Sequence, residues 1–135
     1  MYHYIQDDDS TPPYGYYHLD ITDFRRQLDY FQSNYDIINR KTFIDTIRGD
    51  RSPEEEDLVL TFDDGLVDHH KHALPELIDL GLWGLFYVPA GPYLNDMILD
   101  VHRIHALLGA HGGAVVSEAL TDIVTETMIS NDHRE

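Results

Sequence analysis

The feature that most constrains the fold is the stretch Leu-Val-Leu-Thr-Phe-Asp-Asp-Gly at residues 58–65. Its apolar part is short, partly β-branched or aromatic, and follows an acidic loop, which is typical of a buried strand in a parallel sheet. Ligands of α/β proteins bind at the C-terminal ends of such strands. Two adjacent carboxylates there repel each other and are costly to bury unless a cation or a proton relieves them. The stretch therefore predicts a site in which one of Asp63 and Asp64 binds a metal and the other handles a proton.

A helix and a second strand are expected after this turn. The helix runs over residues 67–80 and ends at Gly81, and Pro75 should kink or divide it. Its predicted inner face consists of apolar residues at helical spacing, namely Ala73, Leu74, Leu77 and Ile78. Residues 84–89 form the second buried strand. A strand, a helix and a strand in this order make a βαβ unit, so the predicted fold class is α/β.

The N-terminal half contains further short elements. Strands are predicted over 2–5 and 35–38, with a surface loop over 7–15. A helix capped by Thr22 carries an apolar stripe at helical spacing, made of Ile21, Phe24, Leu28 and Phe31. A second helix over 42–48 ends at Gly49 and turns inward its apolar residues Phe43, Ile44 and Ile47.

The C-terminal part is predicted to be helical after a loop. Residues 90–96 leave the second strand on the same rim as the aspartate pair and form a natural substrate-facing loop. A helix over 99–108 ends at Gly109, followed by a flexible connector over 110–113. A last amphipathic helix begins at Val115 and includes Met128, and the polar residues 130–135 fray.

The motif Thr-Phe-Asp-Asp-Gly at 61–65 resembles the first motif of the polysaccharide deacetylase family, the NodB-like carbohydrate esterases. The segments Met-Tyr-His-Tyr at 1–4 and Leu-Trp-Gly-Leu-Phe-Tyr-Val-Pro at 82–89 also look like strands of that family. The resemblance implies that Asp63 is the general base and Asp64 a ligand of a divalent metal ion. Zinc is the expected ion, with cobalt, nickel or manganese as alternatives.

The resemblance covers residues 1 to about 108 and also implies a fold. That fold is a partial or distorted (β/α) barrel of the NodB type, formed by a single domain over residues 1–135. Closed barrels usually take roughly 250 residues, so we expect a domain that is incomplete at the C-terminus or completed by an oligomeric partner. The family's metal site is completed by a His-x-x-x-His motif beyond the resembling region.

Several histidines could supply the missing ligands. His102 and His105 are three residues apart and can project from one helix face. They are therefore candidate metal ligands. The resemblance favours the other interpretation, in which they line the cavity or form hydrogen bonds inside it while the true ligands follow Glu135, because it implies that a similar Asp-Val-His-x-Ile-His segment precedes the ligand motif. His69 and His72 could also share a helix face, although a supporting role for Asp68 or His69 fits their position better. His3 either faces the site or is a partly buried structural residue.

Composition excludes several classes of protein. The net charge of −16 argues against binding nucleic acid or an anionic membrane, and would repel a polyphosphate but not a neutral or basic amino sugar. The chain has no cysteine, so a disulfide framework and a thiolate metal site are excluded. No stretch is apolar enough to span a membrane and none resembles a signal peptide, which makes a cytoplasmic location the expectation.

The predicted function is metal-dependent removal of N-acetyl or O-acetyl groups from a sugar or polysaccharide, a hydrolysis of carbon–nitrogen bonds other than peptide bonds. One alternative is a non-catalytic carbohydrate-binding remnant of such an enzyme. Another is a magnesium-dependent phosphotransferase or phosphatase, because acidic pairs at strand ends also bind magnesium. The sequence contains no phosphate-binding glycine loop to support that alternative. Substrate-binding residues cannot be assigned from the sequence.

Overall fold

The computed structural model describes residues 1–7 and 15–124, so Met128, the polar end at 130–135 and most of the predicted loop at 7–15 lie outside the described residues. Its strands are short and pair in parallel: β1 (Ile5–Gln6) with β2 (Leu19–Asp20), β3 (Asp36–Ile37) with β4 (Asp57–Leu58), and β5 (Leu60–Phe62) with β6 (Gly84–Phe86). The N-terminal segment joins two of these pairs, because Tyr2 bridges Phe62 in parallel. The fold is α/β, and the described strands do not close a barrel.

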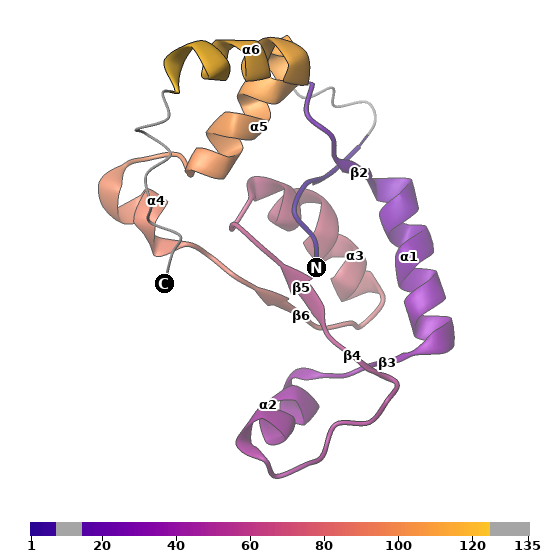
Figure 1. Ribbon diagram of the computed structural model, residues 1–135. Helices are drawn as coiled ribbons and strands as arrows, with labels where there is room; N and C mark the ends of the chain where they lie inside the picture. The colour runs from indigo at the N-terminus through magenta and orange to yellow at the C-terminus, as the bar shows by residue number, and fades with distance from the viewer. Residues whose placement is uncertain (8–14, 125–135) are drawn as a thin grey trace.

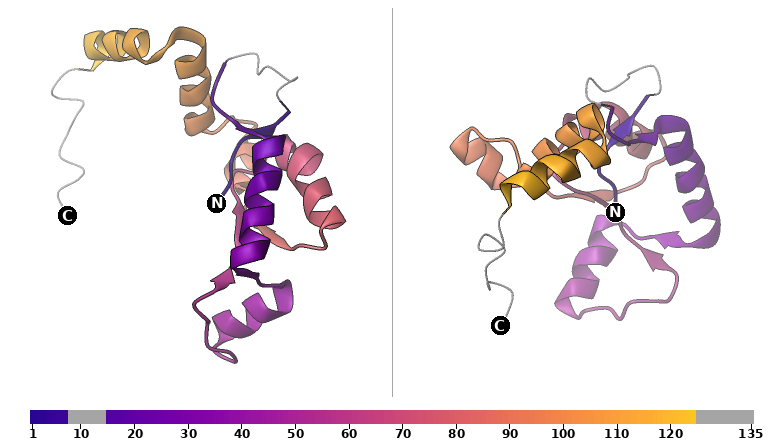
Figure 2. Two further views of the ribbon diagram at one scale, coloured as in Figure 1. Left: turned by 90° about the vertical axis from the view of Figure 1, so that its right-hand side faces the viewer. Right: turned by 45° about the horizontal axis from the view of Figure 1, so that its top comes forward.

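Six α-helices and one π-helical segment accompany the described strands: α1 (Ile21–Asn34), α2 (Arg40–Arg48), η1 (His69–Ala73), α3 (Leu74–Asp79), α4 (Ala90–Asn95), α5 (Asp100–His111) and α6 (Gly113–Ile123). Helices α1 and α3 lie side by side against β5 and β6 (Figure 1), and Arg25 of α1 forms a 2.6 Å ion pair with Glu76 of α3. Helices α2 and α6 lie at opposite ends of the molecule (Figure 2). None of the helices in the described part of the chain has the length and apolarity that crossing a bilayer requires.

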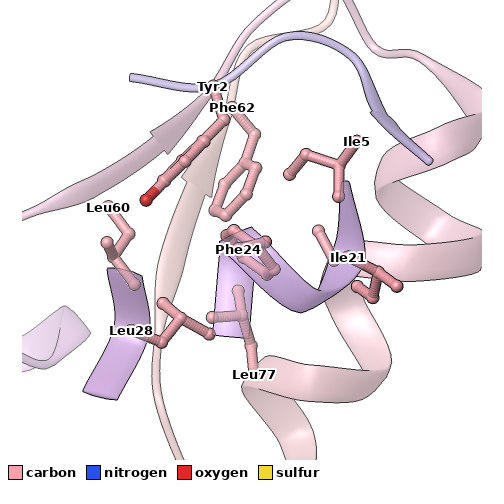
Figure 3. Packing of buried hydrophobic residues seen from close by; sticks show 9 residues of the cluster. Tyr2, Ile5, Ile21, Phe24, Leu28, Leu60, Phe62 and Leu77 are labelled. Atoms are coloured by element: carbon pink, nitrogen blue, oxygen red, sulfur yellow. The ribbon is translucent and has the colours of Figure 1, made fainter. Parts of the chain in front are cut away.

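The hydrophobic core lies between the N-terminal segment, α1, β5 and α3 (Figure 3). Its buried members are Tyr2, Ile5, Ile21, Phe24, Leu28, Leu60, Phe62, Ala73 and Leu77. Phe62 is fully buried and stacks between Tyr2, at 5.4 Å between ring centroids, and Phe86, at 4.6 Å. Burying an aromatic side chain of this size stabilises the fold by about 1.5–3 kcal/mol. The last residue of β5, and with it the start of the following turn, is thus fixed by close packing.

Several local predictions are confirmed. The stripe of α1 is buried at Ile21, Phe24 and Leu28. Gly49 ends α2 in the left-handed region, with φ of 80°. The helix after β5 is divided next to Pro75: a π-helical turn ends at Ala73 and an α-helix begins at Leu74. Proline fits the first turn of the new segment, where its missing N–H has no helical partner.

Other local predictions are wrong. Helix α1 is capped not by Thr22 but by Asp20, whose Oδ1 accepts a 2.7 Å hydrogen bond from the backbone N–H of Thr22. Ile47 and Ile78 were expected to face inward, but they are 66 and 67% exposed. Ile47 lies in the last turn of α2 and Ile78 in the last turn of α3, and no element of the described chain covers either side chain.

The C-terminal segments also differ from the prediction. The expected loop over 90–96 contains helix α4, with Asp96 in the left-handed region at its end, φ 50°. Gly109 does not end α5, which continues to His111 and is followed directly by α6. A glycine inside a helix costs about 1 kcal/mol relative to alanine but does not by itself stop it. None of the residues of α4, α5 or α6 is fully buried.

Candidate active site

The aspartate pair lies where β5 ends and the chain turns sharply. The backbone N–H of Asp63 donates a 2.9 Å hydrogen bond to the carbonyl oxygen of Tyr2, which continues the strand pairing to this residue. Asp64 has φ of 76° and Gly65 has φ of 60°, so two successive residues are left-handed. Asp tolerates this region better than most residues, and glycine adopts it without strain. A side chain at Gly65 would also meet Val88, with its Cβ 3.0 Å from Cγ1.

Both carboxylates are partly exposed and line open hollows. The side chain of Asp63 is 25% exposed and that of Asp64 is 22% exposed. Both contribute to a hollow of about 630 Å³ next to Tyr87 and Val88. Asp64 also lines a hollow of about 340 Å³ whose other wall includes Pro92 of α4. The segment predicted to face a substrate therefore does border the pair, although it is helical.

His102 of α5 contacts the pair directly. Its Nε2 lies 3.1 Å from Oδ2 of Asp64, a hydrogen bond in which the imidazole N–H donates to the carboxylate. The imidazole is 18% exposed and lines the same 340 Å³ hollow as Asp64. The structure thus brings together two of the predicted metal ligands, from elements 38 residues apart.

His3 is the second imidazole beside the pair. Its Nε2 lies 4.0 Å from Oδ2 of Asp63 and 3.8 Å from Oδ2 of Asp64, and its side chain is 40% exposed. These distances are too long for hydrogen bonds but leave room for a bridging water molecule between the groups. Of the two roles predicted for His3, the structure places it facing the site.

His105 is engaged elsewhere. Its Nδ1 lies 3.0 Å from the hydroxyl of Tyr4 on the N-terminal segment. Burial, followed by the charges of Tyr16, Asp64 and Asp68, raises the pKa of Tyr4 to about 12. The phenol therefore keeps its hydrogen at neutral pH, and its hydroxyl occupies Nδ1 of His105 in this hydrogen bond. Sequence reasoning did not single out Tyr4, although its position on the strand next to His3 could have indicated it.

A complete metal site is not formed by the residues described. Within residues 1–7 and 15–124, no three His, Asp or Glu side chains are arranged to hold a metal ion. Catalytic zinc sites normally have three protein ligands and an open position. Asp64 and His102 supply two donors of suitable chemistry, so the site fits a divalent ion only in part.

His69 is a buried residue that holds the N-terminal segment in place next to the site. It is 3% exposed in the π-helical turn, and its Nε2–H donates a 2.6 Å hydrogen bond to the carbonyl oxygen of His3. Burial lowers the pKa of His69, so the ring remains neutral, and its Nδ1 is buried without a hydrogen-bond partner among the described residues. Asp68 accepts a 2.8 Å hydrogen bond from Gln6. His69 and Asp68 therefore both form hydrogen bonds to the N-terminal segment, whereas His70 on the same turn is exposed to solvent.

Comparisons with known proteins bear on the fold. No protein family profile and no curated protein sequence matches this chain. A solved structure of a de-N-acetylase from Aggregatibacter actinomycetemcomitans is similar, with a TM-score of 0.55 and 21% sequence identity. The similarity covers 73% of this chain and 38% of that one, so this chain spans well under half of the de-N-acetylase structure. The chain therefore has a de-N-acetylase-like fold.

Proposed function

We propose that this chain is a hydrolase that removes acetyl groups from the amino nitrogen, or from a hydroxyl oxygen, of a sugar or polysaccharide. The observation that carries the proposal is the pair of adjacent carboxylates at the end of β5, partly exposed in open hollows and contacted by His102. The likeness in fold to a de-N-acetylase supports the same class of reaction. The resemblance of residues 61–65 to the polysaccharide deacetylases adds the assignment of Asp63 as the base and Asp64 as a metal ligand.

We further propose that the reaction depends on a divalent ion held by Asp64 and His102, with zinc first and cobalt, nickel or manganese as alternatives. When bound, such an ion would polarise the amide carbonyl and lower the pKa of a coordinated water. Because only two donors converge in the described residues, we derive no catalytic step from the ion. His105 would need to leave Tyr4 to act as a third ligand.

The protein's own groups account for the movement of protons. Asp63 takes a proton from water while the water oxygen bonds to the acetyl carbon. The bond from that carbon to the sugar nitrogen then breaks, and the nitrogen receives a proton, which gives acetate and a free amino sugar. We propose that His3 relays this proton through one bridging water, which the 4.0 Å from its Nε2 to Asp63 Oδ2 would accommodate. Such positioned proton transfer contributes typically 10²- to 10⁴-fold to the rate.

Acetate release tests the proposal. We expect the chain, supplied with zinc, to release acetate from an N-acetylglucosamine oligomer and not to hydrolyse a phosphate ester, which the charge of −16 disfavours. Asp63→Asn should lower acetate release by about 10²- to 10⁴-fold. Asp79→Asn, a change at the exposed end of α3, is the matched control and should leave the rate unchanged. Equal rates for wild type and Asp63→Asn would overturn the assignment of the base.

A non-catalytic carbohydrate-binding protein is the second candidate. The observation in its favour is that His105, one of three predicted ligands, is hydrogen-bonded to Tyr4. Sugar binding without any acetate release, in the presence of each of the four metals, would select this candidate.

A further inference from the structure

A separate hollow of about 770 Å³ lies between the N-terminal segment and α5 and adjoins the candidate active site. Three tyrosines (Tyr4, Tyr16 and Tyr17) and the imidazoles of His3 and His105 line it, together with Leu108 and with glycines at the end of α5 and the start of α6. We propose that this hollow, the tyrosine pocket, binds the neighbouring ring of a sugar chain while the acetylated unit lies at the aspartate pair. The identity of the ligand as a sugar rests on the proposed function. The substrate would then contain at least two sugar units, one in the tyrosine pocket and one at the aspartate pair.

The arrangement of the rings suits a sugar. The ring centroids of Tyr4 and Tyr16 are 4.5 Å apart with the planes tilted by 43°, so these two side chains form one continuous aromatic wall. Tyr17 next to them is 99% exposed and contributes almost nothing to the core. Tyrosine combines a flat apolar face with a polar tip, which matches a pyranose ring with its C–H face and its hydroxyls.

The hydroxyls of Tyr4 and Tyr16 are held in place by hydrogen bonds, but each can form a further hydrogen bond to a ligand. The hydroxyl of Tyr4 shares a hydrogen bond with Nδ1 of His105, and the hydroxyl of Tyr16 accepts a 3.2 Å hydrogen bond from Nε2 of Gln6. A phenol has one hydrogen to donate and two lone pairs, so each hydroxyl can make at least one further hydrogen bond. These fixed groups can orient the hydroxyls of a ligand.

Charge in the pocket favours a neutral ligand. None of the described residues that line it is Asp, Glu, Lys or Arg. An ionic ligand would find no opposite charge there, and the overall charge of −16 disfavours an anion. The volume lies within the roughly 300–1,000 Å³ typical of small-molecule sites.

His3 lies between the tyrosine pocket and the aspartate pair. This imidazole lines the pocket while its Nε2 lies 3.8–4.0 Å from the two aspartates. At another part of the pocket lining, the backbones of Gly15 and Gly109 lie close together. Gly15 has φ of 62°, and a Cβ there would lie 3.3 Å from the carbonyl oxygen of Gly109 in α5. A ring in the tyrosine pocket would therefore be adjacent to a unit placed at Asp63 and Asp64.

Direct binding tests the inference without requiring catalysis. We would titrate the full chain with N,N′-diacetylchitobiose by calorimetry, for wild type, Tyr17→Ala and Tyr16→Phe, with Tyr30→Ala as the matched control. Tyr30 is 56% exposed on α1, and its ring packs only on Phe31 and Tyr35 among the described aromatic contacts. We expect Tyr17→Ala to weaken binding about three- to tenfold, the range for loss of one aromatic contact, and Tyr30→Ala to have no effect.

The fold should survive the key variant because Tyr17 is exposed, and circular dichroism would check this. Tyr16→Phe removes only a hydroxyl and should weaken binding by a smaller factor. Absence of disaccharide binding by wild type, or equal affinities for wild type and Tyr17→Ala, would overturn the inference.

Acetate release separates this inference from the proposed function. If wild type binds the disaccharide through Tyr17 but releases no acetate, the pocket stands and the proposed function fails. If wild type releases acetate and Tyr17→Ala has an unchanged KM for the disaccharide, the proposed function stands and the pocket is refuted.

Discussion

The packing beneath the aspartate pair makes a quantitative prediction for Gly84→Ala. Gly84 begins β6, and a Cβ there would lie 2.7 Å from Cε2 of Phe62 and 3.2 Å from Cδ1 of Leu77. A Cβ does not approach a non-bonded atom within 3.0 Å, so the ring of Phe62 must shift. That ring is fully buried and stacked against Phe86, which leaves it little freedom to move. Overpacking of this kind typically lowers the free energy of unfolding by about 1–3 kcal/mol.

Urea unfolding followed by fluorescence measures this change. The chain has one tryptophan, Trp83, which adjoins Gly84 and packs on Phe43 with the ring centroids 5.3 Å apart. With a urea slope of about 1–3 kcal/mol per molar, a loss of about 2 kcal/mol lowers the midpoint by roughly 1 M. Gly91→Ala is the control, because nothing lies within 4 Å of a Cβ at that position of α4. Equal midpoints for Gly84→Ala and wild type would refute the close packing of Phe62 on β6.

The remaining predictions concern histidines. Burial lowers the pKa of His69, so the unfolded chain takes up a proton before the folded chain as the pH falls below about 6.5. Stability should therefore decrease from pH 7 to pH 5, and urea unfolding should show a smaller decrease for His69→Gln; equal decreases would contradict the burial of a neutral ring. His102→Ala should lower acetate release by more than the roughly 10- to 100-fold that loss of a residue supporting a metal ligand costs, whereas His105→Ala should have a smaller effect because that ring bonds to Tyr4. The reverse order in the same assay would show that His105 is the functional member of the pair.

The location of the aspartate pair could be predicted because its signals are local. A short apolar run predicts a buried strand, and Asp64 followed by Gly65 suits a left-handed turn, which the structure contains. The division of the next helix at Pro75 likewise depends on the residue's own geometry. These features need no knowledge of the rest of the chain.

The partners of the pair could not be predicted in the same way. His3 and His102 are brought to the turn by strand pairing at Tyr2 and by the placement of α5, which depend on contacts distant in the sequence. Helical spacing puts His102 and His105 on one face, but it does not reveal that Tyr4 binds one of them. The apolar spacing of Ile78 likewise gives the helix face but not which neighbours cover it.

The most direct test of the central claim is a crystal structure of the chain soaked with zinc, with the ion located by its anomalous scattering. The account predicts one ion bound to a carboxylate oxygen of Asp64 and to Nε2 of His102, with Asp63 beside the ion and free to accept a proton. An ion bound elsewhere, or side chains of Asp63 and Asp64 that point away from each other and from the hollows they line, would contradict it.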